Sequence, residues 1–254
     1  MFPNILAAEW IKLRTTKAFW WTTAIFFLVG VGTPALYVYS AVKFDGQENA
    51  ILLPQILVSG VGAFGFLVLM IQAVMVVTGE YRHSVTHSTF QACPNRTLVV
   101  VAKLVLYMVI AAVLTFIGVI GALYAAKLVA SDASAATLDI WGGDISRRIM
   151  WSYPLAAVLL VVFAQAIAWI VRQTAGAISI LFLWYFAVEN LINLLIPKIG
   201  KTIYKYAPFN NFNAFVNDQA VDAPWGVTGS IWYFAAWAFG LMIVAVLLVN
   251  TRDA

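Results

Sequence analysis

Two histidines and an acid stand close together in one polar stretch and suggest a metal ion as a first hypothesis. His83 and His87 are four residues apart, so on a helix they share one face, and Glu80 precedes them by about one turn. A further strong ligand and an H-E-x-x-H pattern are missing, and the single cysteine, Cys93, has no second cysteine beside it. The sequence therefore predicts no metal site.

Patterns for nucleotide binding and for nucleophilic catalysis are also missing. Neither the phosphate-cradling Gly-x-x-x-x-Gly-Lys pattern nor the Gly-x-Ser-x-Gly pattern of a nucleophilic serine occurs. The net charge of +4 is small, so it gives no reason to expect nucleic acid as a partner. We predict a chain that is not an enzyme, has no cofactor of its own and binds no nucleic acid.

One acid lies inside an apolar stretch. Glu189 shares a helix face with Asn193, which follows four residues later. An ionised carboxylate is costly in a bilayer, so Glu189 must face protein or water. Two interpretations stay open: a polar residue of a translocation path or outer gate, or a structural residue that holds the outer end of its helix through hydrogen bonds.

The composition places these residues in a membrane protein. The chain of 254 residues is 63% hydrophobic and 10% charged, whereas a soluble domain has roughly 25% charged residues. Its apolar runs are about 20 residues long and do not alternate, which favours helices over barrel strands. We predict an all-α integral membrane protein with a single transmembrane domain over residues 1–254. The six predicted spans are 18–42, 56–78, 104–123, 153–171, 175–196 and 231–249.

The charge around the first span indicates the orientation of the chain. Lys12, Arg14 and Lys17 precede this span and only Lys43 follows it. Positive charge favours the cytoplasmic side of a membrane. Because an even number of spans puts both ends on one side, we predict a multi-pass protein with both termini in the cytoplasm.

The first seventeen residues have the pattern of a helix at the membrane surface. Four apolar residues fall on one stripe of a helical wheel: Phe2, Leu6, Trp10 and Leu13. Glu9 lies inside that arc, so the stripe is imperfect. We predict an interfacial helix over residues 1–17, with Trp10 at headgroup level. The other residues assigned to this helix's function are Glu9, Lys12 and Arg14.

Residues 196–229 form an aromatic stretch that Pro197 and Pro208 break and that is too short to span. Backbone of this kind is tolerated at membrane depth only where protein or water covers it. We predict a pair of short re-entrant or interfacial helices that cap the outer end of a cavity, with a packed extracellular loop as the alternative. The candidate residues of the translocation path or outer gate are Glu189, Asn193, Tyr206, Pro208 and Phe209.

A compact polar stretch, residues 79–97, separates the second and third spans. Gly79 is predicted to end the second span, and Glu80 then stands near a helix N-terminus, where an acid is favoured. Residues 84–91 can form about two helical turns, which Pro94 stops. This stretch is either an amphipathic loop on the headgroups or a cytoplasmic segment on which another protein pushes.

Several short motifs, taken in their order and spacing, resemble one family. They are GEYRH at 79–83, CPNR at 93–96, AK at 102–103, EWIKLRTT at 9–16 with FWW at 19–21, and Glu189, Pro197 and Tyr206-x-Pro208 after the fifth span. These resemble the "GEYRHGT…P-x-R…AK" signature and the "E-x-x-K-L-R-T-T…W" opening of the ABC-type-2 exporter permeases, especially those of actinobacteria. Ser84 and Val85 stand where Gly-Thr is usual, a small departure.

The resemblance implies the transmembrane permease subunit of an ABC exporter in a bacterial inner or plasma membrane. Such a subunit moves a hydrophobic or amphiphilic substrate out of the cytoplasm. The implied partners are two ATPase subunits that bind ATP and Mg, a second permease copy in a homodimer or heterodimer, and membrane lipid. Residues 79–97 would be the coupling segment in a groove of the ATPase. The implied coupling residues are Glu80, Tyr81, Arg82, His83, Thr86, Phe90 and Arg96.

Two other functions stay open on the residues alone. A stand-alone secondary transporter would use Glu189 for ion coupling, and a membrane scaffold or sensor would transport nothing. The two halves of the chain show no matching Gly or Pro interruptions of the kind found in inverted-repeat transporters, which counts against the first of these.

Overall fold

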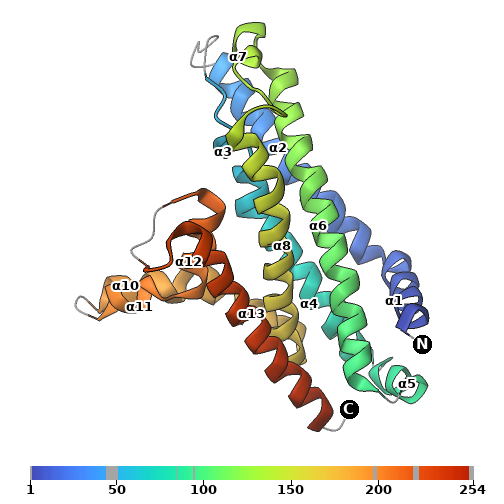
Figure 1. Cartoon of the computed structure of the whole chain (residues 1–254). Coiled ribbons are helices and arrows are strands. Elements are labelled where there is room, and N and C mark those ends of the chain that lie inside the picture. The colour runs from blue at the N-terminus through green and yellow to red at the C-terminus, as the bar shows by residue number, and fades with distance from the viewer. Residues whose placement is uncertain are drawn as a thin grey trace. The chain divides into compact units, whose positions relative to one another are not determined.

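The computed structural model describes residues 2–43, 51–83, 85–93, 95–196, 199–219 and 223–251. Every regular element in these residues is helical (Figure 1). The elements are α1 (Phe2–Thr15), α2 (Lys17–Lys43), α3 (Pro54–Leu57), η1 (Val61–Gly65), α4 (Phe66–Arg82), α5 (Val85–Ala92), α6 (Arg96–Val129), α7 (Asp132–Ala136), α8 (Asp144–Val171), α9 (Thr174–Phe182), η2 (Leu183–Val188), α10 (Glu189–Leu195), α11 (Gly200–Lys205), α12 (Pro208–Asn217) and α13 (Gly226–Thr251).

Six helical stretches in the described part of the chain are long and apolar enough to cross a membrane. They are Lys17–Val42, Val61–Arg82, Arg96–Val129, Asp144–Val171, Thr174–Leu195 and Gly226–Thr251. For the described residues, the prediction of an all-α chain is therefore confirmed, and the number of helices long enough to span agrees with the predicted six. Because a helix satisfies all its own backbone hydrogen bonds, these stretches indicate a multi-pass membrane protein.

Some helices extend beyond the predicted spans. The third span was predicted over 104–123, but α6 has 34 residues and is about 51 Å long, compared with about 30 Å for a hydrocarbon core. α8 begins at Asp144, nine residues before the predicted start of the fourth span at 153, so Pro154 lies inside this helix. A proline inside a membrane helix is tolerated because neighbouring groups can satisfy the backbone atoms that it leaves unpaired.

Two spans contain a π-helical segment, η1 and η2. In a π-helix each backbone bond joins residues five apart, so residues at this spacing lie on one face. In η2 this brings Trp184 to Glu189, and the indole Nε1 donates to the carboxylate Oε1 at 3.1 Å. The side-chain amide of Asn190 donates to the carbonyl of Phe186 at 3.0 Å. The wider turn of η2 therefore places the buried carboxylate of Glu189 beside the indole of Trp184.

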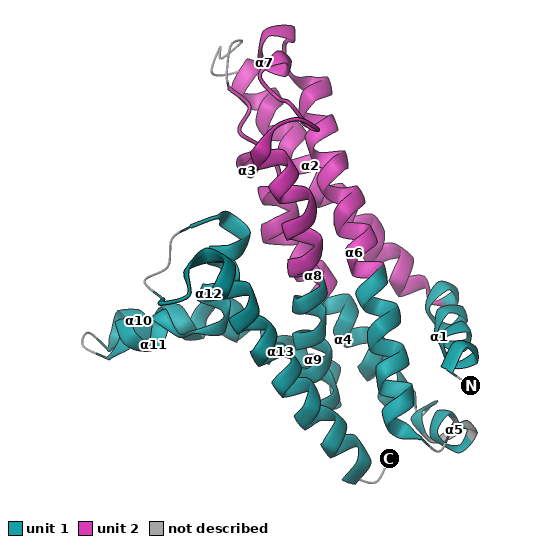
Figure 2. Ribbon diagram, viewed as in Figure 1, with its two compact units in different colours: residues 1–15, 70–109, 158–254 teal, residues 16–69, 110–157 magenta. Residues whose placement is uncertain are grey.

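The described chain divides into two compact units (Figure 2). Unit 1 contains residues 1–15, 70–109 and 158–254, and unit 2 contains residues 16–69 and 110–157. Helices α4, α6 and α8 contribute residues to both units. Each unit has its own set of buried side chains.

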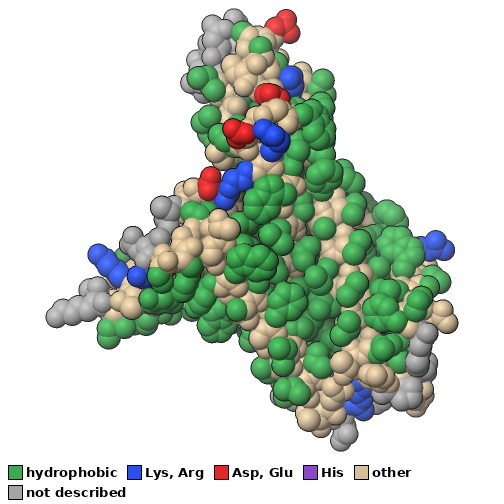
Figure 3. Space-filling model, in the orientation of Figure 1, with side chains coloured by type: hydrophobic (Ala, Val, Ile, Leu, Met, Phe, Trp, Pro, Cys, Tyr) green, Lys and Arg blue, Asp and Glu red, His purple; other side chains and the backbone are tan. Residues whose placement is uncertain are grey.

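The core of unit 2 is built around Phe26, which is fully buried. Its ring lies against two glycines, since a Cβ added at Gly65 or Gly118 would be 2.9 Å from a ring carbon. Phe66 packs against Tyr153, with ring centroids 5.7 Å apart. The charged side chains of this unit gather near α7 and the start of α8, whereas hydrophobic side chains cover most of the other surface in view (Figure 3).

We expect Gly118→Ala to destabilise the protein, because the added methyl group would overlap the ring of Phe26. Overpacking of this kind costs about 1–3 kcal/mol. Gly32→Ala in α2 is the matched control, since nothing lies within 4 Å of a Cβ built there. Thermal unfolding of the protein in detergent should show a lower midpoint for the first variant and an equal or higher one for the second. Equal midpoints for both variants would contradict this packing.

In unit 1, α12 packs on α13 through an aromatic core. Phe212 and Phe234 have ring centroids 4.8 Å apart, and Phe163 and Phe209 are 5.1 Å apart. All four rings are almost completely buried. Seven of the ten residues of α12 are buried, so this short helix is an integral part of the core of unit 1.

Two arginines of unit 1 hold the C-terminal end of α13. Nη1 of Arg96 donates to the carbonyl of Val249 at 3.0 Å, and Nη2 of Arg172 donates to that of Leu248 at 3.4 Å. The last carbonyls of a helix lack intrahelical donors, and cations are favoured beside them. Arg172 itself adopts a left-handed φ of 59° directly after α8, which makes the tight turn into α9.

Candidate functional site

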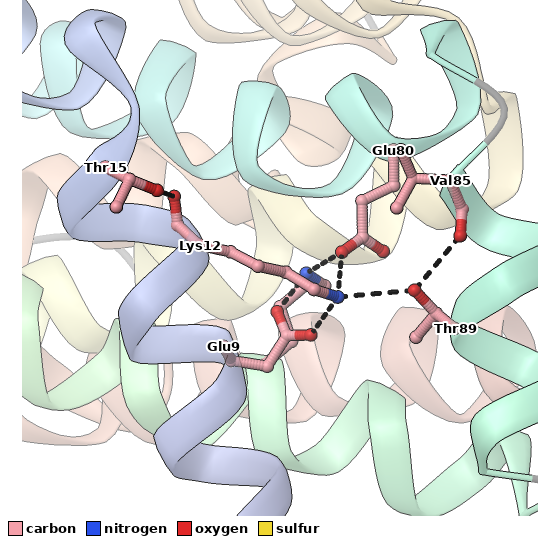
Figure 4. Close-up of polar contacts among 7 residues, drawn as sticks. Glu9, Lys12, Thr15, Glu80, Val85 and Thr89 are labelled. Atoms are coloured by element: carbon pink, nitrogen blue, oxygen red, sulfur yellow. Dashed lines mark hydrogen bonds and ion pairs between the residues drawn. The ribbon is translucent and has the colours of Figure 1, made fainter.

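Four helices of unit 1 bring polar and charged side chains to one place (Figure 4). α1 supplies Glu9 and Lys12, α4 supplies Glu80, α6 supplies Lys103 and α5 supplies Thr89. We call these five residues the ion-pair cluster. They are up to 94 residues apart in the sequence, so the fold assembles the cluster from separate elements.

The two lysines of the cluster each bridge both acids. Nζ of Lys103 donates to Oε2 of Glu9 and, at 3.1 Å, to Oε1 of Glu80. Nζ of Lys12 lies 2.8 Å from Oε1 of both acids and 3.3 Å from Oγ1 of Thr89. The Thr89 hydroxyl donates to the carbonyl of Val85 at 3.1 Å, which leaves its oxygen free to accept from Lys12. Lys12 therefore joins α5 to α1 and α4.

The sequence predicted that Gly79 ends the second span and that Glu80 opens a new segment. The structure differs, because α4 continues through Gly79 to Arg82. A Cβ at Gly79 would have nothing within 4 Å, so this glycine neither breaks the helix nor makes a close contact. Glu80 can stay in the last turn of α4 because the two lysines neutralise its charge.

The ion-pair cluster is mostly shielded from solvent. The side chains of Lys103 and Glu9 are only 2% and 3% exposed, whereas that of Lys12 is 39% exposed. Two positive and two negative charges balance one another. Removing one partner of a buried ion pair costs about 3–5 kcal/mol, because the other charge is left uncompensated. Separating α1, α4 and α6 would therefore unpair buried charges.

Glu9 and Lys12 stabilise each other's charged forms. Burial alone would raise the pKa of Glu9, but Lys103 and Lys12 outweigh it and hold this pKa below its ordinary value of 4.5. Burial alone would lower the pKa of Lys12, but Glu80 and Glu9 outweigh it and raise this pKa above its ordinary value of 10.5.

These two shifts predict a pH window for stability. The folded pKa of Glu9 is lowered, so its contribution is present above 4.5 and is lost as the pH falls through the folded pKa. The folded pKa of Lys12 is raised, so its contribution is present below 10.5 and is lost as the pH rises through the folded pKa. Unfolding midpoints measured against pH should show both losses in the wild type. If the unfolding midpoint falls by the same amount at acid pH in the wild type and in Glu9→Gln, this loss of stability does not come from Glu9.

A second contact joins α5 to α13. The guanidinium of Arg96, the first residue of α6, lies over the ring of Phe90 at 5.2 Å from its centroid. The same side chain donates to the carbonyl of Val249 in α13. Phe90 and Thr89 are neighbours in α5, so this short helix has one anchor toward α1 and another toward α13.

Of the other predicted coupling residues, some pack in the interior and some are exposed. The ring of Tyr81 lies edge-on to that of Trp169, with centroids 6.0 Å apart, and its face lies under the guanidinium of Arg172 at 5.3 Å. Thr86 is buried. Arg82 and His83 are exposed just before α5. The two exposed residues are therefore the ones available to a partner.

Sequence reasoning did not single out two residues of the ion-pair cluster. Thr89 carried no signal, since a threonine in a polar helix is ordinary. Lys103 was not among the predicted coupling residues, although it belongs to the Ala102-Lys103 motif and stands directly before the predicted third span at residue 104. A lysine so close to an apolar run was the available signal, because such a residue needs a partner.

The side chain of His87 lies outside the described residues, and none of the described His, Cys, Asp and Glu residues form a group of three that could hold a metal.

The predicted apolar stripe of α1 does not form one lipid-facing surface. Leu13 is buried together with Glu9, whereas Trp10 is exposed. The charge of Glu9 explains this orientation, because its pairing with Lys103 turns this face of α1 toward α4 and α6. Arg14 is exposed on the other face.

Glu189 receives hydrogen bonds from the beginning of α12. The backbone N–H groups of Phe209 and Asn210 donate to its two carboxylate oxygens at 2.9 and 2.7 Å, in addition to the bond from Trp184. The first N–H groups of a helix lack intrahelical acceptors, and a negative charge is favoured there. A carboxylate from α10 therefore caps α12. Hydrogen bonds of this kind are what Glu189 would make as a structural residue that holds the outer end of the fifth span.

The other predicted gate residues surround this cap. Pro208 is the first residue of α12, and Phe209 is buried beside Phe163. Tyr206 is exposed, and Asn193 is half-buried in α10. The structure thus brings this set together around the α10–α12 region of unit 1. Their role in a translocation path stays a prediction.

No model of a known protein family matches the chain, and no curated protein is significantly similar to it.

Proposed function

We propose that the chain is the membrane-spanning permease subunit of an ABC exporter in a bacterial inner or plasma membrane. In this proposal α5 is the coupling helix, and both termini are cytoplasmic. Two separate ATPase subunits bind ATP and Mg, and a second permease copy completes the pathway for a hydrophobic or amphiphilic substrate. The observation that supports it best is the buried ion-pair cluster, which ties a short polar helix between two spans to the N-terminal helix.

The contacts of α5 suggest how a displacement of this helix would be transmitted to other helices. Through Thr89 and Lys12 it would reach α1 and α4, and through Phe90 and Arg96 it would reach α6 and α13. Because the charges of the cluster are mostly buried, the helices would move together and the ion pairs would stay intact. A partner acting on Arg82 and His83 would thus move several spans at once.

In this proposal, the ATPase subunits supply the driving force for the conformational change of the spans. Closure of the ATPase pair on ATP would favour one arrangement of the spans and nucleotide release the other. ATP then acts as a ligand with different affinities for two states, which is sufficient to shift their populations. The cap of α12 by Glu189 lies in the segment that we assign to the outer gate, so a change in α10 would be passed to α12 directly.

The alternative, a stand-alone secondary transporter, depends on Glu189 as an ion-coupling residue. Both carboxylate oxygens of Glu189 accept backbone hydrogen bonds from α12, and Trp184 adds a further bond. Binding an ion there would have to compete with these bonds. This geometry favours the permease subunit over the secondary transporter.

The proposal is tested by co-purification with an ABC ATPase subunit encoded beside this chain. We expect a stable complex whose ATPase activity is stimulated by the permease. Arg82→Ala and His83→Ala together should weaken this complex about tenfold, as expected for exposed contact residues. Arg147→Ala, which removes another exposed arginine near the start of α8, should not. Absence of any complex, or an unchanged affinity in the double variant, would overturn the assignment of residues 79–97 as the coupling segment.

A further inference from the structure

α11, a helix of six residues between the fifth and sixth spans, is fixed in place by its neighbours. Gly200 lies so close to α10 that an added Cβ would be 2.3 Å from the carbonyl oxygen of Ile192. Only glycine permits this approach. The beginning of α11 is therefore packed tightly on the end of the fifth span.

The C-terminal end of α11 is held by three side chains of α12 and α13. The amide of Asn210 donates to the carbonyl of Tyr204 at 2.9 Å, and that of Asn211 donates to the carbonyl of Lys205 at 3.0 Å. The hydroxyl of Tyr233 donates to the carbonyl of Tyr206 at 2.7 Å. Carbonyls that end a helix usually bond to water or to capping groups. Here protein side chains satisfy them, so the orientation of α11 is set and its other faces are presented outward.

The outward faces of α11 combine apolar and cationic side chains. Ile199, Ile203 and Tyr206 recur at helical spacing and are 62%, 42% and 41% exposed. Lys201 is exposed, and Lys205 lies partly exposed with its ammonium 5.5 Å from the centre of the Tyr206 ring. Blue and green side chains lie side by side over α11 (Figure 3).

Neither lysine of α11 has a carboxylate within 4.0 Å in the described part of the chain. Glu189, the acid nearest to Lys201 in the sequence, is directed into the cap of α12. Two unneutralised positive charges beside an apolar stripe are complementary to an anionic lipid surface, in which acyl chains lie next to phosphate groups. A tyrosine at the edge of such a stripe is typical of the headgroup layer.

We propose that α11 lies in the headgroup layer and binds anionic phospholipid through Lys201 and Lys205. The apolar stripe of α11 enters the acyl-chain boundary, and the two ammonium groups contact lipid phosphate. This inference depends on the chain's being a membrane protein and not on its being an ABC permease. The lipid would thereby hold the α10–α12 region, including the Glu189 cap, at the level of the membrane surface.

The first test measures lipid bound to the purified full chain. The chain is reconstituted in phosphatidylcholine vesicles with or without phosphatidylglycerol, extracted, and its retained lipid is counted by native mass spectrometry. Lys201→Gln/Lys205→Gln should reduce phosphatidylglycerol retention about tenfold, because each lysine at an anionic surface contributes several-fold to binding. Lys201→Arg/Lys205→Arg should restore it, and Lys17→Gln/Arg147→Gln, which removes the same charge elsewhere, should leave it unchanged. Equal retention by the first variant and the wild type would overturn the proposal.

The second test keeps both lysines and reports the depth of α11. Ile203→Cys in a Cys93→Ser background is labelled with an environment-sensitive fluorophore in the same vesicles. We expect strong quenching by lipid carrying a nitroxide at its headgroup and weak quenching by iodide in the water. Dominant quenching by iodide would overturn the proposal. A disulfide between the cysteines of two copies would also overturn it, because a second copy would then occupy this surface.

Discussion

Replacing Lys103 with methionine should lower the free energy of unfolding by about 3–5 kcal/mol. Methionine keeps the length of the side chain but removes its charge. Glu9, which is almost fully buried, would lose its closest partner, and Lys12 alone would have to balance two acids. Denaturant unfolding of the protein in detergent micelles, followed by its tryptophan fluorescence, measures this loss.

A second substitution separates the loss of an ion pair from the loss of packing. Glu9→Gln/Lys103→Met removes one charge of each sign, so it should recover most of the stability that Lys103→Met loses. Lys17→Met, which removes an exposed lysine at the start of α2, is the control and should be neutral. If Lys103→Met unfolds like the wild type, or if the double variant is no more stable than the single one, the cluster does not hold the helices by charge.

Glu189→Ala should release α12 from α10. The substitution leaves the backbone N–H groups of Phe209 and Asn210 without their acceptors, at about 1–3 kcal/mol each. Hydrogen exchange followed by mass spectrometry should show peptides of α12 exchanging at least about thirtyfold faster, since each 1.4 kcal/mol corresponds to about tenfold. Glu189→Gln keeps one oxygen acceptor, so its effect should be intermediate.

The neighbouring residue is the matched control for this prediction. Asn190 lies beside Glu189 in α10, but it is exposed and its amide donates only to the carbonyl of Phe186. Asn190→Ala should therefore leave exchange in α12 close to that of the wild type. Slow exchange in Glu189→Ala would show that the carboxylate is not needed as a cap. It would then be free for the role in a translocation path that the sequence leaves open.

The sequence was sufficient for the number and type of the spans, because length and apolarity decide them in a bilayer. It was less reliable for their ends. Polar residues usually mark the boundary of a span, but Glu80 stays inside α4 and Arg96 begins α6, since each has partners from other helices. The π-helical turn at η2 leaves no pattern in the sequence, although it determines that Trp184 contacts Glu189.

The contacts of the candidate site could not be read from spacing. Lys12 and Glu80 are 68 residues apart, and Glu9 and Lys103 are 94 residues apart. The sequence named all four of these residues through their position in polar segments or a family resemblance. It did not show that they meet, because that depends on how α1 packs on α4 and α6. For Glu189, the structure supplies the hydrogen bonds that one of the two open interpretations required.

In the proposed permease, Lys12 holds α1 and α5 together, so that both move as one body when a partner acts on α5. The most direct measurement is a distance between spin labels on two exposed residues, Ala8→Cys in α1 and Gln91→Cys in α5, in a Cys93→Ser background. It is made on the complex with the ATPase subunit, with and without ATP. We predict one unchanged distance in both states for the wild type, and a broadened or shifted distance with ATP when Lys12→Met is added. A distance that shifts with ATP equally with and without Lys12 would contradict the account.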